Sequence, residues 1–239
     1  MTVARAILPL ALDGVCYDAG GTRHIHGLTF TLAHGPRTVI LGPNGAGKSL
    51  TLRLCHGLLR PSAGTVRWAD PAAAPKRQAM VFHHPVMLRR SAAANIAYAL
   101  ALNRVPRAQR GALAAQALAR VGLDDIAGRA ARALSAGQQQ RLALARAWAL
   151  EPEVLFLDEP TASLDPAATR AIEEAIDAVH ASGAKVVMTT HDLGQARRLA
   201  DEVLFLHHGR LLEHGPAESF FAAPRSREAA AFLAGELLW

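Results

Sequence analysis

Residues 42–49 are of the type and spacing that bind the phosphates of a nucleotide. The run fits the pattern G-x-x-x-x-G-K-[ST] at each fixed position, and it consists of Gly42, Pro43, Asn44, Gly45, Ala46, Gly47, Lys48 and Ser49. Its glycines let the backbone fold around a phosphate with N–H groups pointing inward. Lys48 can reach the β- and γ-phosphates, and the Ser49 hydroxyl can coordinate Mg²⁺. A glycine-rich turn that matches by chance is the alternative. The run predicts a nucleoside triphosphate site.

The segments on either side of this loop have the character that such a site requires. Residues 38–41 are apolar and β-branched and predict a buried strand, and residues 50–54 predict a helix. A helix that begins beside the loop adds a partial positive charge where the phosphates bind. Leu50, at the start of the expected helix, is counted among the nucleotide-binding residues.

A second chemical element follows the apolar run 154–157, which predicts a strand buried on both faces. Its C-terminal end delivers two adjacent carboxylates. Asp158 is placed to hold the Mg²⁺ shell, and Glu159 can polarise an attacking water as general base. Asp-Glu-Pro is also a reasonable turn at the end of a strand, which is the structural alternative.

The composition favours a single domain in a reducing compartment. The 239 residues can bury a large core, and no apolar stretch reaches the ~18 residues that cross a bilayer. Residues 6–12 predict a first strand rather than a signal peptide. Cys16 and Cys55 form no disulfide framework, and we expect both to be buried. The net charge of +6 does not discriminate between partners, and no basic arm suggests nucleic acid.

Strand and helix patterns alternate along most of the chain. Short β-rich runs occupy the first 82 residues, alanine-rich helical sequence dominates residues 91–150, and strands then alternate with helices, the first of them expected at 166–181. Alternating strands and helices predict an α/β fold with a mainly parallel sheet, in which the helical block is inserted as a subdomain.

The segment 134–141, Leu-Ser-Ala-Gly-Gln-Gln-Gln-Arg, makes the resemblance to a family specific. The chain resembles the ATP-binding subunit of an ABC transporter, whose signature motif is Leu-Ser-Gly-Gly-Gln. The matching positions are Ser135, Ala136, Gly137 and Gln138, with Ala136 in place of the first signature glycine. From the residues alone, an ordinary Ser-capped helix over 138–150 with an anion site at its start is the other interpretation.

This resemblance implies a fold and a division of the chain. The expected fold is the ABC ATPase form of a P-loop NTPase core, with a mainly parallel central sheet, an N-terminal antiparallel β-subdomain and an inserted α-helical subdomain. The core would comprise about 1–85 and 151–215, the helical subdomain about 86–150, and a C-terminal helical tail about 216–239.

Smaller motifs fall in the order that the family shows. Tyr17 stands where an aromatic ring stacks on adenine, although a half-buried strand tyrosine would look the same. Asp165 matches the D-loop that crosses to the partner subunit, and by itself it predicts a helix cap. His191 matches the switch histidine that senses the γ-phosphate, whereas a lone histidine after a strand is usually structural.

The resemblance also implies cofactors and partners. ATP and Mg²⁺ would be bound, with Ser49, Asp158 and the residue at position 83 near the metal. Two copies would form a head-to-tail homodimer, in which the signature helix of one copy acts on the ATP of the other. Integral membrane permease subunits and an extracytoplasmic solute-binding protein would complete the system. The subunit would be cytoplasmic, peripheral on the inner face of the membrane, and would dock its permease through residues 82–94.

One position departs from the family pattern. Relatives carry Gln after the strand that precedes residue 83, where it links the γ-phosphate, Mg²⁺ and the permease contact, and this chain carries His83. A neutral imidazole can offer nitrogen to a bound water, or less readily to Mg²⁺, which prefers oxygen, and a protonated imidazole would repel the metal. Packing in a mobile loop, with water bridging the metal, is the alternative.

The resemblance indicates a substrate class only indirectly, since the solute never touches this subunit. Residues 83–91 and 95–98 are similar to the tungstate-type and phosphate-type importer ATPases, and the chain ends soon after its last expected strand. We therefore expect an oxyanion importer of the tungstate kind, with phosphate or molybdate import as alternatives. The ATPase module of an exporter or lipid-release system would use the same residues. A nucleic-acid-linked ATPase would need a second cassette or a coiled-coil insertion, and the sequence contains neither.

Overall fold

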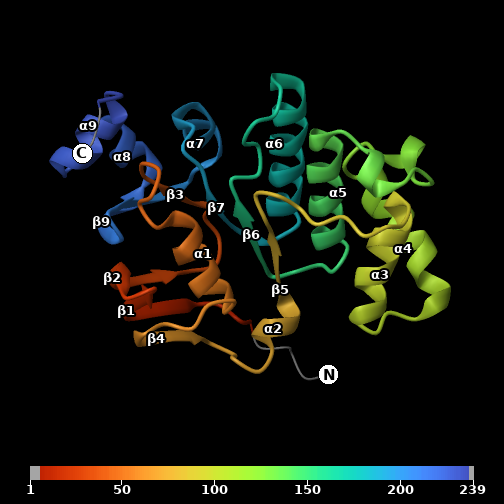
Figure 1. The fold of residues 1–239 in the computed structure, drawn as a ribbon, viewed down its shortest axis with the longest axis horizontal. Helices are drawn as coiled ribbons and strands as arrows, with labels where there is room; N and C mark the ends of the chain where they lie inside the picture. Colours follow the sequence, from red (N-terminus) through yellow and green to blue (C-terminus); the bar gives the residue numbers. More distant parts are fainter. Residues whose placement is uncertain (1–5, 237–239) are drawn as a thin grey trace. The chain divides into compact units, whose positions relative to one another are not determined.

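The computed structural model describes residues 6–236, which divide into two compact units. The first unit joins the described residues up to Pro75 to those from Lys185 onward, and the second runs from Lys76 to Ala184. Figure 1 colours the elements of both units along the sequence. The first unit is therefore discontinuous in sequence, and the second is one continuous insertion.

An antiparallel sheet in the first unit contains β1 (Leu10–Ala19), β2 (Thr22–Leu32) and β4 (Ala63–Trp68), with β1 in the middle. The first strand begins at Leu10 and not at residue 6, so the expected bounds 6–12 were wrong. Leu10 lies opposite Leu32 on one side and Trp68 on the other. Pro9, immediately before it, has no N–H to donate to a ladder, which accounts for the later start.

The parallel strands of the first unit carry the phosphate loop. β3 (Thr38–Leu41) lies between β7 (Lys185–Thr189) and β8 (Glu202–His207), parallel to both, and β9 (Arg210–Pro216) runs antiparallel to β8. Every residue of β3 and β7 is buried, as expected for strands covered on both faces. The helices of this unit are α1 (Lys48–His56), α7 (Leu193–Leu199), α8 (Ala217–Ala222) and α9 (Arg227–Leu233).

The two cysteines both lie in the first unit as free thiols. Cys55 in α1 is fully buried, and burial raises the pKa of its thiol to about 12, as expected for an inert structural thiol. Cys16 in β1 is only partly buried, which corrects the expectation that both would be buried. The Sγ atom of Cys16 accepts a hydrogen bond from the N–H of Gly27 at 3.2 Å.

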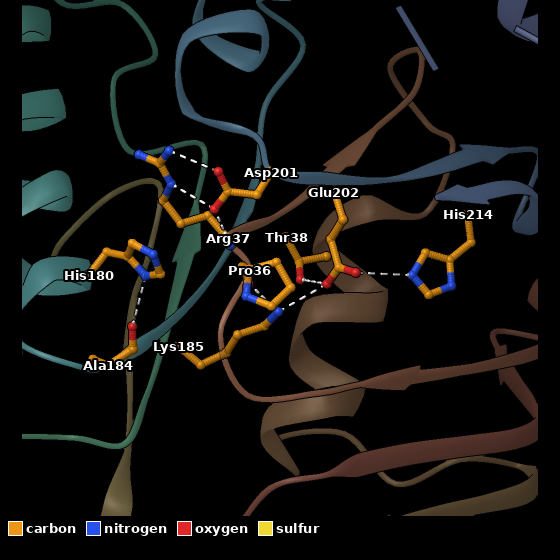
Figure 2. Close-up of polar contacts among 9 residues, drawn as sticks. All are labelled: Pro36, Arg37, Thr38, His180, Ala184, Lys185, Asp201, Glu202 and His214. Carbon is orange, nitrogen blue, oxygen red and sulfur yellow. Dashed lines mark hydrogen bonds and ion pairs between the residues drawn. The ribbon is translucent and has the colours of Figure 1, made fainter. Parts of the chain in front are cut away.

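A polar network joins the amino-terminal ends of β3, β7 and β8 (Figure 2). The buried Nζ of Lys185 donates to Oε1 of Glu202 at 2.9 Å and also to the carbonyl of Pro36. The Thr38 hydroxyl donates to the same Glu202 oxygen, and Nε2 of His214 lies 3.5 Å from the other. Burial opposes ionisation of Glu202, but hydrogen bonds from His214, Thr38 and Lys185 outweigh it and lower its pKa to about 2.

A second charged pair anchors β3 close by in the same unit. The Arg37 guanidinium donates from Nε and Nη2 to the two carboxylate oxygens of Asp201, at 3.1 and 3.0 Å, as Figure 2 shows. The backbone N–H of Arg37 also donates to Asp201 at 2.7 Å. This forked geometry fixes the start of β3 beside the start of β8, and it is stronger than a single contact between point charges.

The second unit combines a pair of parallel strands with a set of helices. β5 (Gln78–Val81) pairs with β6 (Val154–Asp158), and the helices are α3 (Ala92–Leu102), α4 (Arg107–Ala119), α5 (Ala136–Trp148) and α6 (Pro166–Ala181), with 3₁₀ turns η1 (Asp124–Ile126) and η2 (Ala131–Ala133). The short α2 (Ala74–Arg77) falls at the boundary of the two units. The alanine-rich block is helical as its composition predicts, and α6 has the expected bounds.

The signature helix α5 begins at Ala136, two residues before the expected start at 138. Ser135 caps it, because its hydroxyl accepts a hydrogen bond from the N–H of Gln138 while the Gln138 side chain accepts one from the N–H of Ser135. This reciprocal capping box fixes the start of the helix at the first residue after the serine.

Candidate functional site

The phosphate loop lies between the C-terminal end of β3 and the first turn of α1, as its sequence predicts. Gly42, Gly45 and Gly47 have φ values of 149°, 80° and 95°, a region that side chains rarely enter. A Cβ on Gly42 would lie 2.1 Å from the carbonyl oxygen of Leu206, and one on Gly47 would lie 2.7 Å from Cδ1 of Ile25. Gly42 is thus required by backbone conformation and by close packing, and Gly47 by its backbone conformation.

Lys48 holds its ammonium inside this loop. The side chain is buried, and Nζ donates hydrogen bonds to the carbonyls of Gly42 at 2.9 Å and Pro43 at 3.1 Å. These bonds place a positive charge beneath the backbone that folds around an anion. α1 has no acidic residue in its first turn and no side-chain cap, so its first N–H groups and its dipole also favour a phosphate.

Tyr17 and His191 belong to the same unit as the phosphate loop. Tyr17 lies opposite Ile25 in the β1–β2 ladder, and directly paired residues share one face of a sheet. Since Ile25 packs against Gly47, the tyrosine lies on the strand next to the one that contacts the loop. His191 follows β7 and is exposed, and the preceding N–H of Thr190 donates to Ile40 of β3. His191 therefore follows a residue bonded to the strand that bears the loop, and Tyr17 lies one strand away from Ile25, which contacts the loop.

The carboxylates expected to do chemistry are at the end of β6 in the second unit. Asp158 is only 1% exposed. Glu159 follows with φ of 46°, the left-handed region that non-glycine residues seldom adopt. Unusual backbone angles of this kind cost of order 1–3 kcal/mol and are concentrated at functional sites. The backbone thus turns sharply at the residue expected to act as general base.

His83 lies beside that same carboxylate. Its Nδ1 is 3.9 Å from Oε2 of Glu159, and its ring meets the ring of His84 edge-on at 4.1 Å between centroids. Sequence reasoning connected His83 with the metal and did not foresee its contact with Glu159. The contact arises because β5 and β6 are parallel neighbours, so the residues that follow them emerge at one edge.

The signature and D-loop residues are also in the second unit, each at the start of a helix. Ser135 and Ala136 are exposed at the start of α5, and Gly137 is buried. Asp165 caps α6, with Oδ1 accepting from the N–H of Ala168 at 2.8 Å, and Ser163 before it has φ of 61°. Asp165 thus serves as the helix cap that its sequence also predicted.

Mg²⁺ would find oxygen ligands in the residues expected to hold it. In residues 6–236, no group of three or more His, Cys, Asp or Glu side chains could by itself hold a metal ion. Mg²⁺ sites commonly use only one or two protein oxygens, together with substrate phosphates and water. The carboxylate of Asp158 in the second unit and the hydroxyl of Ser49 in the first are each of the oxygen type that Mg²⁺ prefers, and the imidazole of His83 is a poorer donor.

Three side chains that sequence reasoning did not select fix the loop before α3. Asn95 is fully buried, accepts from the N–H of Leu88 and donates to the carbonyls of Arg90 and Ser91. Arg132 donates to the carbonyl of Met87 at 3.0 Å, and Arg146 donates to that of Val86 at 2.9 Å. The sequence did contain one sign of this role: Asn95 is a polar residue in an otherwise apolar helix, four residues after the capping Ser91.

The comparison with known families identifies the family of the chain. The chain belongs to the ABC transporter family, because the model of that family matches residues 25–162, more than half of the chain. It is accordingly an ATP-binding subunit with ATP hydrolysis as its activity. The resemblance predicted from the phosphate loop and the signature segment is thus confirmed.

Relatives with known names include several import subunits. The phosphate import ATP-binding protein PstB 2 of Natronomonas pharaonis is 37% identical, over 96% of this chain and 88% of its own. The tungstate uptake ATP-binding protein TupC of Peptoclostridium acidaminophilum is 37% identical, over 84% and 94%. The molybdenum import protein ModC of Mycobacterium tuberculosis is 41% identical over 83% of this chain, which spans only 58% of ModC.

Solved structures confirm the α/β fold with its antiparallel and parallel sheets. CbiO1 of Clostridium perfringens, part of an ABC transporter complex, superposes with a TM-score of 0.80 at 27% identity, covering 90% of each chain. A bacterial Atm1-family ABC exporter with ATP bound has a TM-score of 0.82 at 26% identity, and this chain spans 44% of it. In residues 6–236, no helix is both long enough and apolar enough to cross a bilayer.

Proposed function

We propose that this chain is the ATPase subunit of an importer for a small oxyanion, of the tungstate kind. The observation that carries the proposal is the match to TupC, which is 37% identical and is covered over 94% of its length. Phosphate and molybdenum importers are also among the relatives, so phosphate and molybdate are the next candidates. All three solutes are tetrahedral oxyanions.

In this proposal each residue that acts on ATP has a distinct role. The loop 42–49 and Leu50 bind the phosphates, Tyr17 stacks on adenine, and His191 senses the γ-phosphate. Asp158 and Ser49 hold Mg²⁺, which neutralises phosphate charge, and Glu159 activates water as general base. His83 replaces the family glutamine, and its contact with Glu159 supports a role at the reacting end of the nucleotide.

Each ATP site is completed by residues from a second copy of the chain. In a head-to-tail homodimer, Ser135, Ala136, Gly137 and Gln138 of one copy face the γ-phosphate bound to the other, and Asp165 crosses the dimer interface. The exposed start of α5, with backbone N–H groups at its amino-terminal end, supports this assignment. ATP then favours the closed dimer and hydrolysis favours the open one, a ligand-driven population shift.

The permease docks on the segment 82–94. Val86 is 69% exposed and Phe82 is 38% exposed, although both are apolar. Because Asn95, Arg132 and Arg146 hold the backbone of this segment, these side chains are presented on a fixed surface instead of collapsing inward. Exposed apolar side chains on a fixed backbone fit a protein partner.

The same proposal gives the location and the division of the chain. The subunit is cytoplasmic and peripheral on the inner face of the membrane, and an extracytoplasmic solute-binding protein serves the permease. The functional subdomains are a core of about 1–85 and 151–215, a helical subdomain of about 86–150 and a tail of about 216–239. Nucleic acid is not a partner.

Export is the second candidate, since an Atm1-family exporter has a TM-score of 0.82. Its identity of 26% over 44% of that protein is weaker than the match to import subunits. The test is to purify the chain with its permease and binding protein and to measure ATPase stimulation by tungstate, molybdate, phosphate and sulfate. Stimulation by tungstate at the lowest concentration supports the proposal, and a response to none of the four oxyanions contradicts it.

A further inference from the structure

Gly137 of α5 and Ala168 of α6 touch at a point where there is no room for another methyl group. A Cβ built on Gly137 would lie 2.8 Å from Cβ of Ala168 and 4.0 Å from its Cα. Carbon atoms pack at roughly 3.5–4.0 Å, so the new methyl would overlap its neighbour. The Ala168 methyl is attached directly to the backbone and cannot rotate away, so one of the two helix starts would have to move.

Backbone conformation does not require glycine at position 137. Gly137 is not among the glycines with positive φ, and it lies in the first turn of a regular helix. A helical glycine is about 1 kcal/mol less favourable than alanine, so its presence needs a compensating reason. Gly111, inside α4, provides a comparison, because a Cβ there would meet nothing within 4 Å. The two glycines therefore differ in the room available for a side chain, which is absent at position 137 and present at position 111.

The contact joins the starts of two functional segments. Ser135 caps α5 two residues before Gly137, through the N–H of Gln138. Asp165 caps α6 and accepts its hydrogen bond from the N–H of Ala168 itself, at 2.8 Å. A displacement of Ala168 is thus transmitted directly to the Asp165 carboxylate through that bond.

We propose that Ala168 is a positioning residue for ATP hydrolysis, because its contact with Gly137 sets the spacing between Ser135 and Asp165. The inference rests on the proposed function, in which these two residues act on the ATP of the second copy. Ala168 touches no reacting atom in this account. It determines whether signature and D-loop can engage one nucleotide at the same time.

Glycine at position 137 can be explained in two ways, by the need for its backbone N–H at the γ-phosphate or by the spacing between the two helix starts. The two explanations make different predictions. If only its N–H matters, alanine keeps that donor and should keep the activity. If the spacing matters, Gly137→Ala must push the helix starts apart by roughly 1 Å, the difference between 2.8 Å and a normal contact. Displacements of that size cost about 100-fold in rate.

The test is a four-protein cycle on the full-length chain, comprising wild type, Gly137→Ala, Ala168→Gly and the double variant. We expect Gly137→Ala to lower kcat about 100-fold and Ala168→Gly alone to lower it about tenfold, because the spacing then loses the methyl that sets it. The double variant should recover to within about threefold of wild type, since the methyl added at position 137 takes the place of the one removed at position 168. The affinity of the isolated subunit for a fluorescent ATP analogue should differ from wild type by less than about twofold in all three variants.

Gly111→Ala is the matched control, because it adds the same methyl to a helix where nothing lies in its way. Its rate should stay within about twofold of wild type. Wild-type activity of Gly137→Ala would overturn the proposal. A double variant as inactive as Gly137→Ala would also overturn it, because a purely structural role for glycine gives no specific rescue.

A variant that enlarges the contact from the other side covers the case in which Gly137→Ala does not fold. Ala168→Val should lower kcat to a similar extent with Gly137 intact, and full activity of Ala168→Val would count against the proposal. Ser135→Arg distinguishes a failure of the composite-site function from a failure of the positioning role of Ala168. If Ser135→Arg is fully active, the composite-site function itself is wrong, whereas an inactive Ser135→Arg with an unrescued double variant rejects only the positioning role.

Discussion

The ammonium of Lys185 lies 2.9 Å from the carboxylate of Glu202, and the lysine side chain has no exposed surface. Burial lowers the pKa of Lys185 even though Glu202 accepts its hydrogen bond, so desolvation of the ammonium outweighs the attraction on the lysine side. The bond to Glu202 thus offsets only part of the unfavourable burial of the ammonium. Removing one partner should destabilise the fold strongly, because the other charge would stay buried without a counter-charge.

Glu202→Gln should lower the free energy of unfolding by about 3–5 kcal/mol, because Lys185 would lose its counter-charge in a buried site. Adding Lys185→Met to that variant should recover most of the loss. Urea unfolding followed by circular dichroism measures both. Glu174→Gln is the control, since Glu174 pairs with Arg170 across an exposed helix surface and its removal should cost less than about 0.5 kcal/mol. Equal effects of Glu202→Gln and Glu174→Gln would contradict the prediction.

Acid should remove the advantage of wild type over Glu202→Gln. The pKa of Glu202 is lowered in the folded state from 4.5 to about 2, so its ionised form stabilises the fold at pH values above about 4.5. That contribution is lost as the pH falls from about 4.5 towards 2. The difference in urea midpoint between wild type and Glu202→Gln should therefore narrow across this range. A constant difference would show that Glu202 stabilises the fold through packing rather than charge.

Glu159→Gln should lower ATP hydrolysis by a factor of about 100 or more and leave ATP binding intact, because only activation of water is removed. The variant should accumulate as an ATP-bound closed dimer, visible by size-exclusion chromatography with Mg-ATP. Lys48→Ala is the contrasting variant, since it removes the charge facing the β- and γ-phosphates and should weaken nucleotide binding itself. Hydrolysis by Glu159→Gln close to the wild-type rate would show that another residue is the general base.

Ser135→Arg should eliminate ATPase activity and leave ATP binding to the single subunit unchanged, since it places a bulky cation where the second copy's γ-phosphate belongs. It also removes the cap of α5, which costs about 1 kcal/mol. Ser135→Asn serves as control for that effect, because asparagine also caps well. Mixing Ser135→Arg with Lys48→Ala regenerates one intact composite site per mixed dimer. Full activity of Ser135→Arg alone would exclude the composite site.

His83→Gln should raise the ATPase rate at neutral pH and lower the Mg²⁺ concentration needed for half-maximal rate, because an amide oxygen is a better magnesium partner than an imidazole nitrogen. The contact between His83 and Glu159 adds a second expectation. In the Glu159→Gln background, the same substitution should have less effect on the rate, since the two residues then no longer act together. Superimposable Mg²⁺ titrations of wild type and His83→Gln would exclude any role for His83 at the metal.

Sequence reasoning located the phosphate loop, the apolar strand before Asp158 and the cap at Asp165, because each depends on residues close together along the chain. It placed the start of α5 two residues late, since the reciprocal bonds between Ser135 and Gln138 were not weighed. It also extended the first strand to residue 6, beyond Pro9, which cannot donate to the ladder. These errors concern boundaries, where local signals compete.

Contacts between distant segments could not be predicted in this way. Nothing in the sequence near Lys185 indicates that Glu202 and the carbonyl of Pro36 will surround it, because that depends on the order of β7, β3 and β8. The contact of Gly137 with Ala168 likewise depends on how two helices approach each other. Pairing order and helix approach are properties of the assembled chain, and a single sequence without its relatives does not specify them.

The discontinuity of the first unit has a consequence for synthesis on the ribosome. Arg37 and its partner Asp201 are 164 residues apart in sequence, and both neighbours of β3 lie beyond the inserted unit. A growing chain therefore presents β3 long before any strand that can pair with it has been made. The inserted unit is continuous in sequence, so all of its helices and strands are made after β3 and before β7 and β8. Until β7 and β8 follow, the apolar strand that leads into the phosphate loop has unpaired edges, a condition that favours aggregation.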